Sequence, residues 1–367
     1  MDRRGGRLRR MVPRLAVTAS LGLVVFGGEV QSAAALTITP YFDSSVIGAA
    51  NASQIEAAVD AAIHPLASMF GDPVNVGILF GVAHGGNTFL GESLNAGYLF
   101  PYSDYTSALA FDAATHVNHP ESAGVASLGT ATRADLIFAT SADSRAVGCG
   151  GCLGEFDSHG NYTGSGPMDG VVLLNIDAPL AFARSHGTIG ATQYDARSVL
   201  QHEIDEVLGI GGAGSALNDA YAQGVNGPPS ISIGGSTQTY ISPLDLYRYA
   251  GPGAASFTTD PAATAYFSLD GGRTAIARFS QDPNGDAGDW YSPGPLEPFA
   301  PCGSLVQDAF ACPGIVANMG PNSPEVTALQ AIGYDRVPEP GTLPLLSTAL
   351  GLLAWVGRRR RGRTAPS

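Results

Sequence analysis

Hydrophobic residues along the chain follow two patterns, short apolar runs and longer segments with helical spacing. Apolar side chains recur every three or four positions from Ile55 to Leu66, which predicts an amphipathic helix over 51–70. The segment 169–176 (DGVVLLNI) is centred on an apolar run of the kind found in buried strands. We expect strands at 36–42, 74–83 and 169–176, and helices at 51–70, 104–115, 132–144 and 194–210, the last ending at Gly211-Gly212.

The pattern changes after residue 212. The next stretch is rich in Gly and Asn and has no strong period, and residues 242–281 have the pattern of short strands and turns. A closing helix is predicted within 323–335, with Ser323 as its N-cap, Pro324 in its first turn and Gly333 at its end. This order of elements indicates one α+β domain over 36–337, layered like an α/β protein, with a mixed twisted sheet, a central helix and an irregular Gly-rich C-terminal half.

Both ends of the chain have the composition of processing segments. Residues 1–35 combine an Arg-rich start, a short apolar run and small residues near Ala35, as a secretory signal peptide does; a membrane helix is the alternative. At the other end, residues 338–363 hold Pro338, Glu339 and Pro340, then an apolar segment, then an Arg cluster. This order resembles the PEP-CTERM sorting signal. The resemblance implies removal of the tail by an exosortase.

The apolar segment of this tail is short for a permanent membrane helix. As a helix, residues 343–357 would span about 22 Å, against about 30 Å for the hydrocarbon core of a bilayer. The Arg cluster would stay on the cytoplasmic side. We therefore expect transient anchoring in the inner membrane and then release or attachment at the cell surface, with a permanent anchor as the alternative.

Charge is distributed unevenly along the chain. All 19 basic residues are Arg, and only eight of them lie in 36–337, against 29 acidic residues, a net charge of −21 for that segment. Such a body repels phosphate backbones, so we expect no nucleic-acid partner. It suits a soluble exported protein or one that binds cations. Without lysine, no Walker-type phosphate loop is possible.

The segment LQHEIDEVLGIGG (200–212) carries the strongest chemical signal. On a helix, His202 and Glu206 lie one turn apart on the same face, so both can bind one ion. Glu203 lies beside them, where a general base would act on a water. A carboxylate can replace the second imidazole of the usual His-Glu-x-x-His zinc motif. An ordinary amphipathic helix is the alternative, but its apolar neighbours imply burial of three polar side chains, which a cation would make less costly.

The sequence leaves the third metal ligand open. The remaining histidines and two acidic residues downstream are candidates: His64, His84, His116, His119, His159, His186, Asp219 and Asp245.

Two further groups of residues have recognisable spacing. Cysteines occur at 149, 152, 302 and 312; in an exported protein we expect disulfides, with Cys302–Cys312 as one bridge and Cys149–Cys152 as either a local disulfide or a redox pair. A calcium loop is a candidate over 282–289, and a solvated acidic turn is the alternative. Its ligands would be Asp282, Asn284, Asp286 and Asp289.

The chain resembles exported bacterial metalloprotease-like proteins that often carry PEP-CTERM tails and are distantly related to metzincins. The resemblance rests on YDARSVLQHEIDEVLGIGG, SPLDLYRYAGPG, AYFSLDGG, GDAGDW and TALQAIGYD, and covers most of 74–335. It implies a zincin-like domain, zinc held by His202 and Glu206, and Glu203 as general base. The family's third ligand falls on Gly212, where no ligand exists, and Met319 lies where a Met-turn would come.

Two functions follow from these patterns. The first is an exported zinc-dependent peptidase that hydrolyses peptide bonds with a metal-activated water. The second is a non-catalytic surface or matrix protein on a degenerate zincin scaffold. In both, signal peptidase and exosortase are the expected processing partners, with a peptide or protein substrate in the first.

Overall fold

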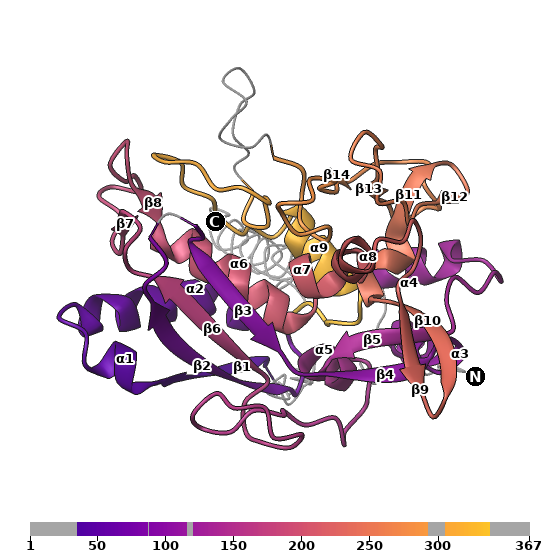
Figure 1. The fold of residues 1–367 in the computed structure, drawn as a ribbon, viewed down its shortest axis with the longest axis horizontal. Helices are drawn as coiled ribbons and strands as arrows, with labels where there is room; N and C mark the ends of the chain where they lie inside the picture. Colours follow the sequence, from indigo (N-terminus) through magenta and orange to yellow (C-terminus); the bar gives the residue numbers. More distant parts are fainter. Residues whose placement is uncertain (1–34, 87, 116–119, 293–304, 338–367) are drawn as a thin grey trace, which may run out of the picture. The chain divides into compact units, whose positions relative to one another are not determined.

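The structure is a computed structural model that describes residues 35–86, 88–115, 120–292 and 305–337. Four strands form the sheet that supports the candidate site, in the order β1 (Thr37–Phe42), β2 (Asn75–Ala83), β6 (Gly170–Asn175) and β3 (Gly91–Asn95) (Figure 1). The first three strands are parallel and β3 pairs antiparallel with β6. Strand β3 therefore forms one edge of this sheet in the described part of the chain.

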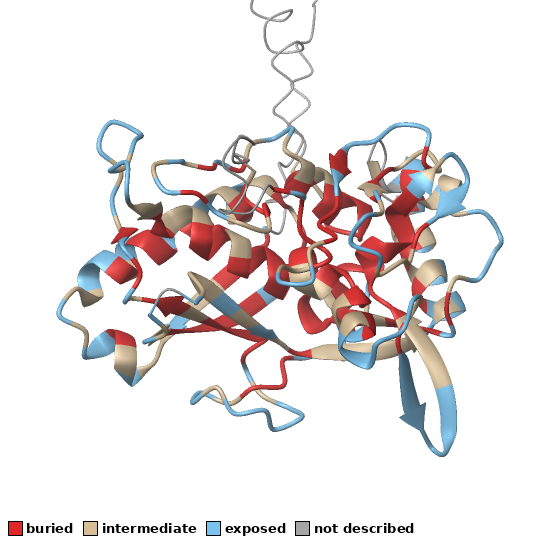
Figure 2. Ribbon diagram, turned by 45° about the horizontal axis from the view of Figure 1, so that its top comes forward, coloured by how far each residue is buried: buried red, intermediate tan, exposed pale blue. Residues whose placement is uncertain are grey.

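Two long helices pack next to this sheet. Helix α2 (Ala52–Met69) contacts β1 and helix α6 (Ala196–Leu208), and α6 in turn contacts β3 and β6. The buried face of α2 runs from Ile55 to Leu66, as its apolar spacing predicts. Figure 2 shows buried residues in red where these helices meet the strands. Nearly all residues of α6 are buried, including carboxylates, so this helix lies inside the fold rather than on its surface.

The remaining strands form smaller sheets. A second sheet has the order β4 (Gly97–Pro101), β5 (Leu136–Thr140), β10 (Ser236–Ile241) and β9 (Ser230–Ile233). The Gly-rich half contributes a third sheet of β12 (Ala254–Ala255), β11 (Arg248–Gly251), β13 (Tyr266–Phe267) and β14 (Ala277–Arg278). A two-stranded pair joins β7 (Leu180–Ala181) and β8 (Tyr194–Asp195).

Eight further helices complete the described part of the chain. They are α1 (Ser44–Ile47), α3 (Tyr102–Thr115), α4 (Pro120–Ser127), α5 (Ser141–Ala146), α7 (Gly211–Gly214), α8 (Leu217–Gln223), the 3₁₀ helix η1 (Pro243–Tyr247) and α9 (Pro324–Ala331). Helix α9 begins as predicted, since the Ser323 hydroxyl accepts the Val326 N–H and Pro324 occupies the first turn. This mixture of parallel and antiparallel strands with helices confirms the α+β class.

Two expectations about secondary structure are wrong. The segment 132–144, predicted as one helix, forms strand β5 and then the short helix α5, because Leu136–Thr140 pairs with both β4 and β10. Helix α6 ends at Leu208, with Gly209 as its C-cap at φ 110°, and not at Gly211-Gly212. A left-handed conformation suits glycine, so Gly209 ends the helix two residues before the expected point.

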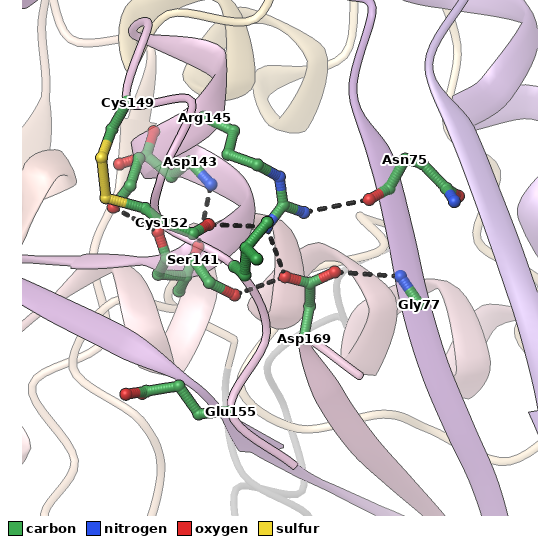
Figure 3. A network of polar contacts seen from close by, with 12 residues as sticks. Asn75, Gly77, Ser141, Asp143, Arg145, Cys149, Cys152, Glu155 and Asp169 are labelled. Carbon is green, nitrogen blue, oxygen red and sulfur yellow. Dashed lines mark hydrogen bonds and ion pairs between the residues drawn. A yellow bond between two sulfur atoms is a disulfide. The ribbon is translucent and has the colours of Figure 1, made fainter. Parts of the chain in front are cut away.

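A buried ion pair ties α5 to the first sheet (Figure 3). Arg145 Nη1 donates to Asp169 Oδ1 at 2.8 Å and to the Cys152 carbonyl at 2.8 Å. Asp169 also accepts the Ser141 hydroxyl and the Gly77 N–H of β2. Because Asp169 directly precedes β6, this network fixes the start of a central strand.

Two of the cysteines lie beside this network. Cys149 and Cys152 form a disulfide with Cα atoms 5.5 Å apart, the local pair that the sequence left open between a bridge and a redox site. Cys312 is also disulfide-bonded, whereas Cys302, its expected partner, lies outside the described residues.

Asp335 is hydrogen-bonded to the segment that follows α2. The Asp335 carbonyl accepts the Gly71 N–H at 2.7 Å, and the buried Asp72 carboxylate accepts the Asp335 N–H at 3.0 and 3.1 Å. The end of the closing segment is thereby held against the end of α2. The pKa of Asp72 is raised from 3.8 to about 7, and burial is the main cause. The backbone hydrogen bond from Asp335 lowers this pKa, and the nearby Asp335 carboxylate raises it.

We expect Asp72→Asn to remove part of the pH dependence of stability. Folded Asp72 holds its proton to about pH 7 and the unfolded chain only to about pH 4, so the wild type loses stability as pH rises from 4 to 7. The loss is at most about 4 kcal/mol for a shift of this size. Urea unfolding at pH 5 and pH 8 measures it, with exposed Asp60→Asn as control. If Asp72→Asn loses as much stability between pH 5 and pH 8 as the wild type does, Asp72 is not a source of the pH dependence.

Candidate metal centre

Helix α6 places three polar side chains on the wall of a cleft of about 1190 Å³. His202, Glu203 and Glu206 all line it, and both glutamates are only 6% exposed. Their positions follow from helix geometry, because residues four apart lie one above the other. The structure therefore brings together the three residues of the helix that the sequence singled out.

The third side chain of the centre is Asp289. His202 Nε2 lies 3.6 Å from Asp289 Oδ2 and 3.7 Å from Glu206 Oε1. One ligand atom from each of the three residues lies within 4.8 Å of the others, the only such group of at least three His, Cys, Asp or Glu in the described part of the chain. Donor atoms around a tetrahedral zinc, with bonds of 2.0–2.2 Å, lie about 3.3–3.6 Å apart. The observed separations are too long for good hydrogen bonds and suit a shared cation.

Neighbouring groups hold the side chains of His202 and Glu206 in place. His202 Nδ1 lies 3.1 Å from the Val306 carbonyl, which accepts an Nδ1–H and leaves the Nε2 lone pair facing the carboxylates. Glu206 Oε2 accepts the Ser93 hydroxyl of β3 at 2.6 Å, and its Oε1 accepts the Gly212 N–H at 2.9 Å. Such outer contacts orient metal ligands in proteins.

Asp289 is held just as firmly. Its Oδ1 accepts Gln307 Nε2 at 2.9 Å, which leaves Oδ2 for His202. The next residue, Trp290, is 1% exposed, and its indole N–H donates to Glu325 of α9 at 3.1 Å. A buried aromatic anchor thus fixes the backbone that carries Asp289.

Glycines allow the Asp289 loop to reach α6. A Cβ on Gly211 would lie 2.1 Å from Gln307 Nε2, and a Cβ on Gly288 would lie 1.7 Å from the Gly211 carbonyl. A Cβ on Gly212 would lie 2.6 Å from Glu206 Oε1 and about 3.1 Å from the Asp286 carboxylate. At the position where the resemblance expects a third ligand, a side chain would therefore meet the carboxylates of Glu206 and Asp286.

Glu203 differs from the other carboxylates of the centre. Its carboxylate makes no hydrogen bond with any described residue, although the side chain is more than nine-tenths buried and lines the cleft. It fits against β3 because Gly91 has no side chain; a Cβ there would lie 2.5 Å from Glu203 Oε1. A buried, unpartnered carboxylate is costly unless a ligand or cation uses it.

Burial and repulsion between carboxylates raise the pKa values of the acidic groups in the centre. Burial raises the pKa of Glu203 well above its usual value, and the charge of Glu206 raises it further. Burial and the charge of Glu206 do the same to Asp289. Burial alone would lower the pKa of His202, but Glu203 and Glu206 reverse this, and the net pKa is raised. Several carboxylates thus share one imidazole, and a divalent cation would compensate them.

The other predicted ligands are elsewhere. His64, His84, His159 and His186 do not line the cleft, and His116 and His119 lie outside the described residues. Asp245 is fully engaged, because its oxygens accept from Ser215, Ala216 and Ser242. Asp219 lines the cleft but accepts the Tyr240 hydroxyl at 2.6 Å. Met319 is buried in the main core and does not line the cleft.

The candidate calcium loop divides into two parts. Asp282 Oδ1 accepts the backbone and side-chain N–H groups of Asn284 at 2.9 Å, which is a local turn. Asp286 instead accepts from Asn218, and Asp289 faces His202. In the described chain, Asp282, Asp286 and Asp289 do not form a three-carboxylate group. The acidic spacing over 282–289 thus singled out Asp289 in the sequence, but as a calcium ligand and not as a neighbour of His202 and Glu206.

No helix in the described part of the chain is long and apolar enough to cross a membrane. The apolar segment 343–357 and the residues Pro338, Glu339 and Pro340 lie outside the described residues.

Comparison with known proteins finds no match: no family model, no curated protein and no solved structure corresponds to the chain. Its own residues must therefore indicate what the centre does.

We expect Asp289→Ala to weaken zinc binding by more than about 100-fold, since loss of even an outer-shell contact costs 10–100-fold. Asp282→Ala removes a carboxylate from the same loop and should change the affinity by less than about threefold. Competition with a chromophoric chelator measures both. The reverse order would restore the calcium-loop interpretation and exclude Asp289 as a ligand.

Proposed function

We propose that the chain is an exported zinc-dependent peptidase on a zincin-like domain. The observation that carries the proposal is the convergence of His202, Glu206 and Asp289 beside Glu203, an unpartnered buried carboxylate, on the wall of an open cleft. The three ligand atoms fit zinc in number and chemical type, and each residue has its outer atom held by a neighbour.

Zinc and Glu203 would have different roles in the reaction. Zinc, when bound by His202, Glu206 and Asp289, supplies Lewis-acid polarisation of the scissile carbonyl and acidifies a water. Glu203 takes a proton from the attacking water and gives it to the leaving amine, so that the C–N bond breaks and both products are complete. Burial favours this role, since a raised pKa brings a carboxylate closer to the value a proton shuttle needs.

The cleft supports a peptide as the substrate. Strand β3 is the edge of the first sheet in the described chain and also lines the cleft through residues such as Gly91 and Ser93. An extended peptide can add to an edge strand by backbone hydrogen bonds. It would then pass directly by Glu203, which lies against Gly91, and by Glu206, which accepts the Ser93 hydroxyl.

We expect Glu203→Gln to retain zinc and to lower peptide cleavage by at least about 100-fold, because proton transfer contributes 10²–10⁴-fold. Glu206→Ala should lose both zinc and cleavage. Elemental analysis and cleavage of an unstructured protein by the purified full chain measure the two effects. A wild-type chain that binds no added zinc would instead favour the non-catalytic surface protein.

We also propose the route by which the protein leaves the cytoplasm. Signal peptidase would remove residues 1–35, and exosortase would act on residues 338–363, so that the chain is anchored in the inner membrane only until its tail is cut.

Replacing Pro338, Glu339 and Pro340 together by Ala should leave the protein in the membrane fraction with its tail intact, because the recognition motif is lost. Fractionation followed by mass measurement of the C-terminal peptide tests this. Normal release of the triple variant would remove the sorting signal from the proposal.

A further inference from the structure

The cleft that contains the candidate metal centre has many acidic side chains in its lining. Besides the three carboxylates of the centre, five more line it, and no arginine of the described chain does so. The five are Glu92, Asp195, Asp219, Asp286 and Asp308. His202 is the only residue with basic character on the wall, so acidic side chains outnumber basic ones there by eight to one.

Part of this negative charge has a partner and part has none. Arg184 pairs with Asp195, and a divalent metal would offset Glu206 and Asp289. Asp219 and Asp286 receive only neutral donors, the Tyr240 hydroxyl and the Asn218 amide. Glu203 has no partner among the described residues despite its burial. The cleft therefore keeps a net negative field after the metal is bound.

Asp219 and Asp286 belong to one surface, which we call the acidic wall and define as Asn218, Asp219, Tyr240 and Asp286. Asn218 joins its parts, since its amide donates to Asp286 and its Oδ1 accepts the Ala287 N–H at 2.8 Å. The wall adjoins the metal centre, because Asp286 and the Glu206 carboxylate both meet the Cβ position of Gly212.

The two ends of the acidic wall are open to solvent. Asp219 is exposed and Asp286 is half-buried. A long, flexible cationic side chain can therefore approach both carboxylates without first displacing a protein cation. Such a charge on a substrate would gain attraction at the wall while the substrate backbone lies along β3.

We propose that this site acts on cationic peptides and selects an arginine or lysine side chain close to the scissile bond, held by the acidic wall. The inference rests on the proposed peptidase function and adds the substrate class to it. A neutral or acidic side chain at the same place would gain nothing from Asp219 and Asp286, or would be repelled by them.

The test compares fluorogenic peptides that differ in one residue, arginine or its uncharged isostere citrulline, placed in turn at each position around the cleaved bond. The purified full chain is loaded with zinc and kcat/KM is measured at low salt. At one position we expect arginine to exceed citrulline by roughly tenfold, and we expect the ratio to fall as salt rises. A ratio near one at every position overturns the proposal.

Asp219→Asn should lower this arginine-to-citrulline ratio to about threefold or less, since it removes one charge of the wall and keeps an oxygen for Tyr240. Asp60→Asn, the same change on the exposed face of α2, should leave the ratio unaltered. Because the ratio compares two substrates of one variant, a general loss of activity does not change it. An unchanged ratio in Asp219→Asn overturns the role of the wall.

Failure of the peptidase function gives a different result. In that case no peptide is cleaved, or cleavage survives in Glu203→Gln. Equilibrium binding of the same arginine and citrulline peptides, measured by fluorescence polarisation, then decides the inference alone. Preference for the arginine peptide that weakens in Asp219→Asn supports it, and equal binding overturns it.

Discussion

The compensation of buried negative charge is the constraint on which the centre depends. Helix α6 carries Glu203 and Glu206 in a buried position, and the fold adds Asp289 from a distant loop. Burial penalises each charge, and the carboxylates repel one another, so the pKa values of all three are raised. One imidazole cannot offset three carboxylates. A divalent cation offers a single solution that also explains the orientation of His202.

Close backbone approach is the second requirement, and glycine provides it. Gly211 and Gly288 bring the Asp289 loop against the end of α6, where any Cβ would collide with backbone or with Gln307. Gly91 plays the same part for Glu203 on the β3 side. The centre is thus assembled between a rigid helix, an edge strand and a loop anchored by Trp290. Its precision comes from packed elements rather than from the flexible ends of long side chains.

The charge of the cleft is the basis of the proposed preference for cationic peptides. Zinc held by two carboxylates and one imidazole would form a group with no net charge. The nearby Asp219 and Asp286 would then leave the cleft negative. This pattern agrees with the composition of residues 36–337, where acidic residues exceed arginines by 21. Two of the eight arginines form ion pairs with buried aspartates, Arg145 with Asp169 and Arg184 with Asp195.

Local patterns in the sequence predicted elements whose hydrophobic spacing is strong. Helices α2 and α9, strands β1, β2 and β6, and the helix that carries His202 and Glu206 all form close to the expected positions. The pattern of 132–144 misled because an apolar run followed by a short helix has no distinctive period, and pairing of β5 with β4 and β10 decided its first half. Strand β3 was missed because GESLN has little β-propensity and forms through its antiparallel pairing with β6.

The sequence by itself determined one face of the centre, because residues four apart on a helix must lie together whatever the rest of the chain does. It also determined the acidic character of residues 36–337. Only the tertiary structure decided that Asp289, 83 positions after Glu206, is the third side chain, and that Asp219 and Asp286 face one cleft. Such contacts depend on loop paths and glycine-permitted approach, and no local spacing encodes the distance between residues so far apart.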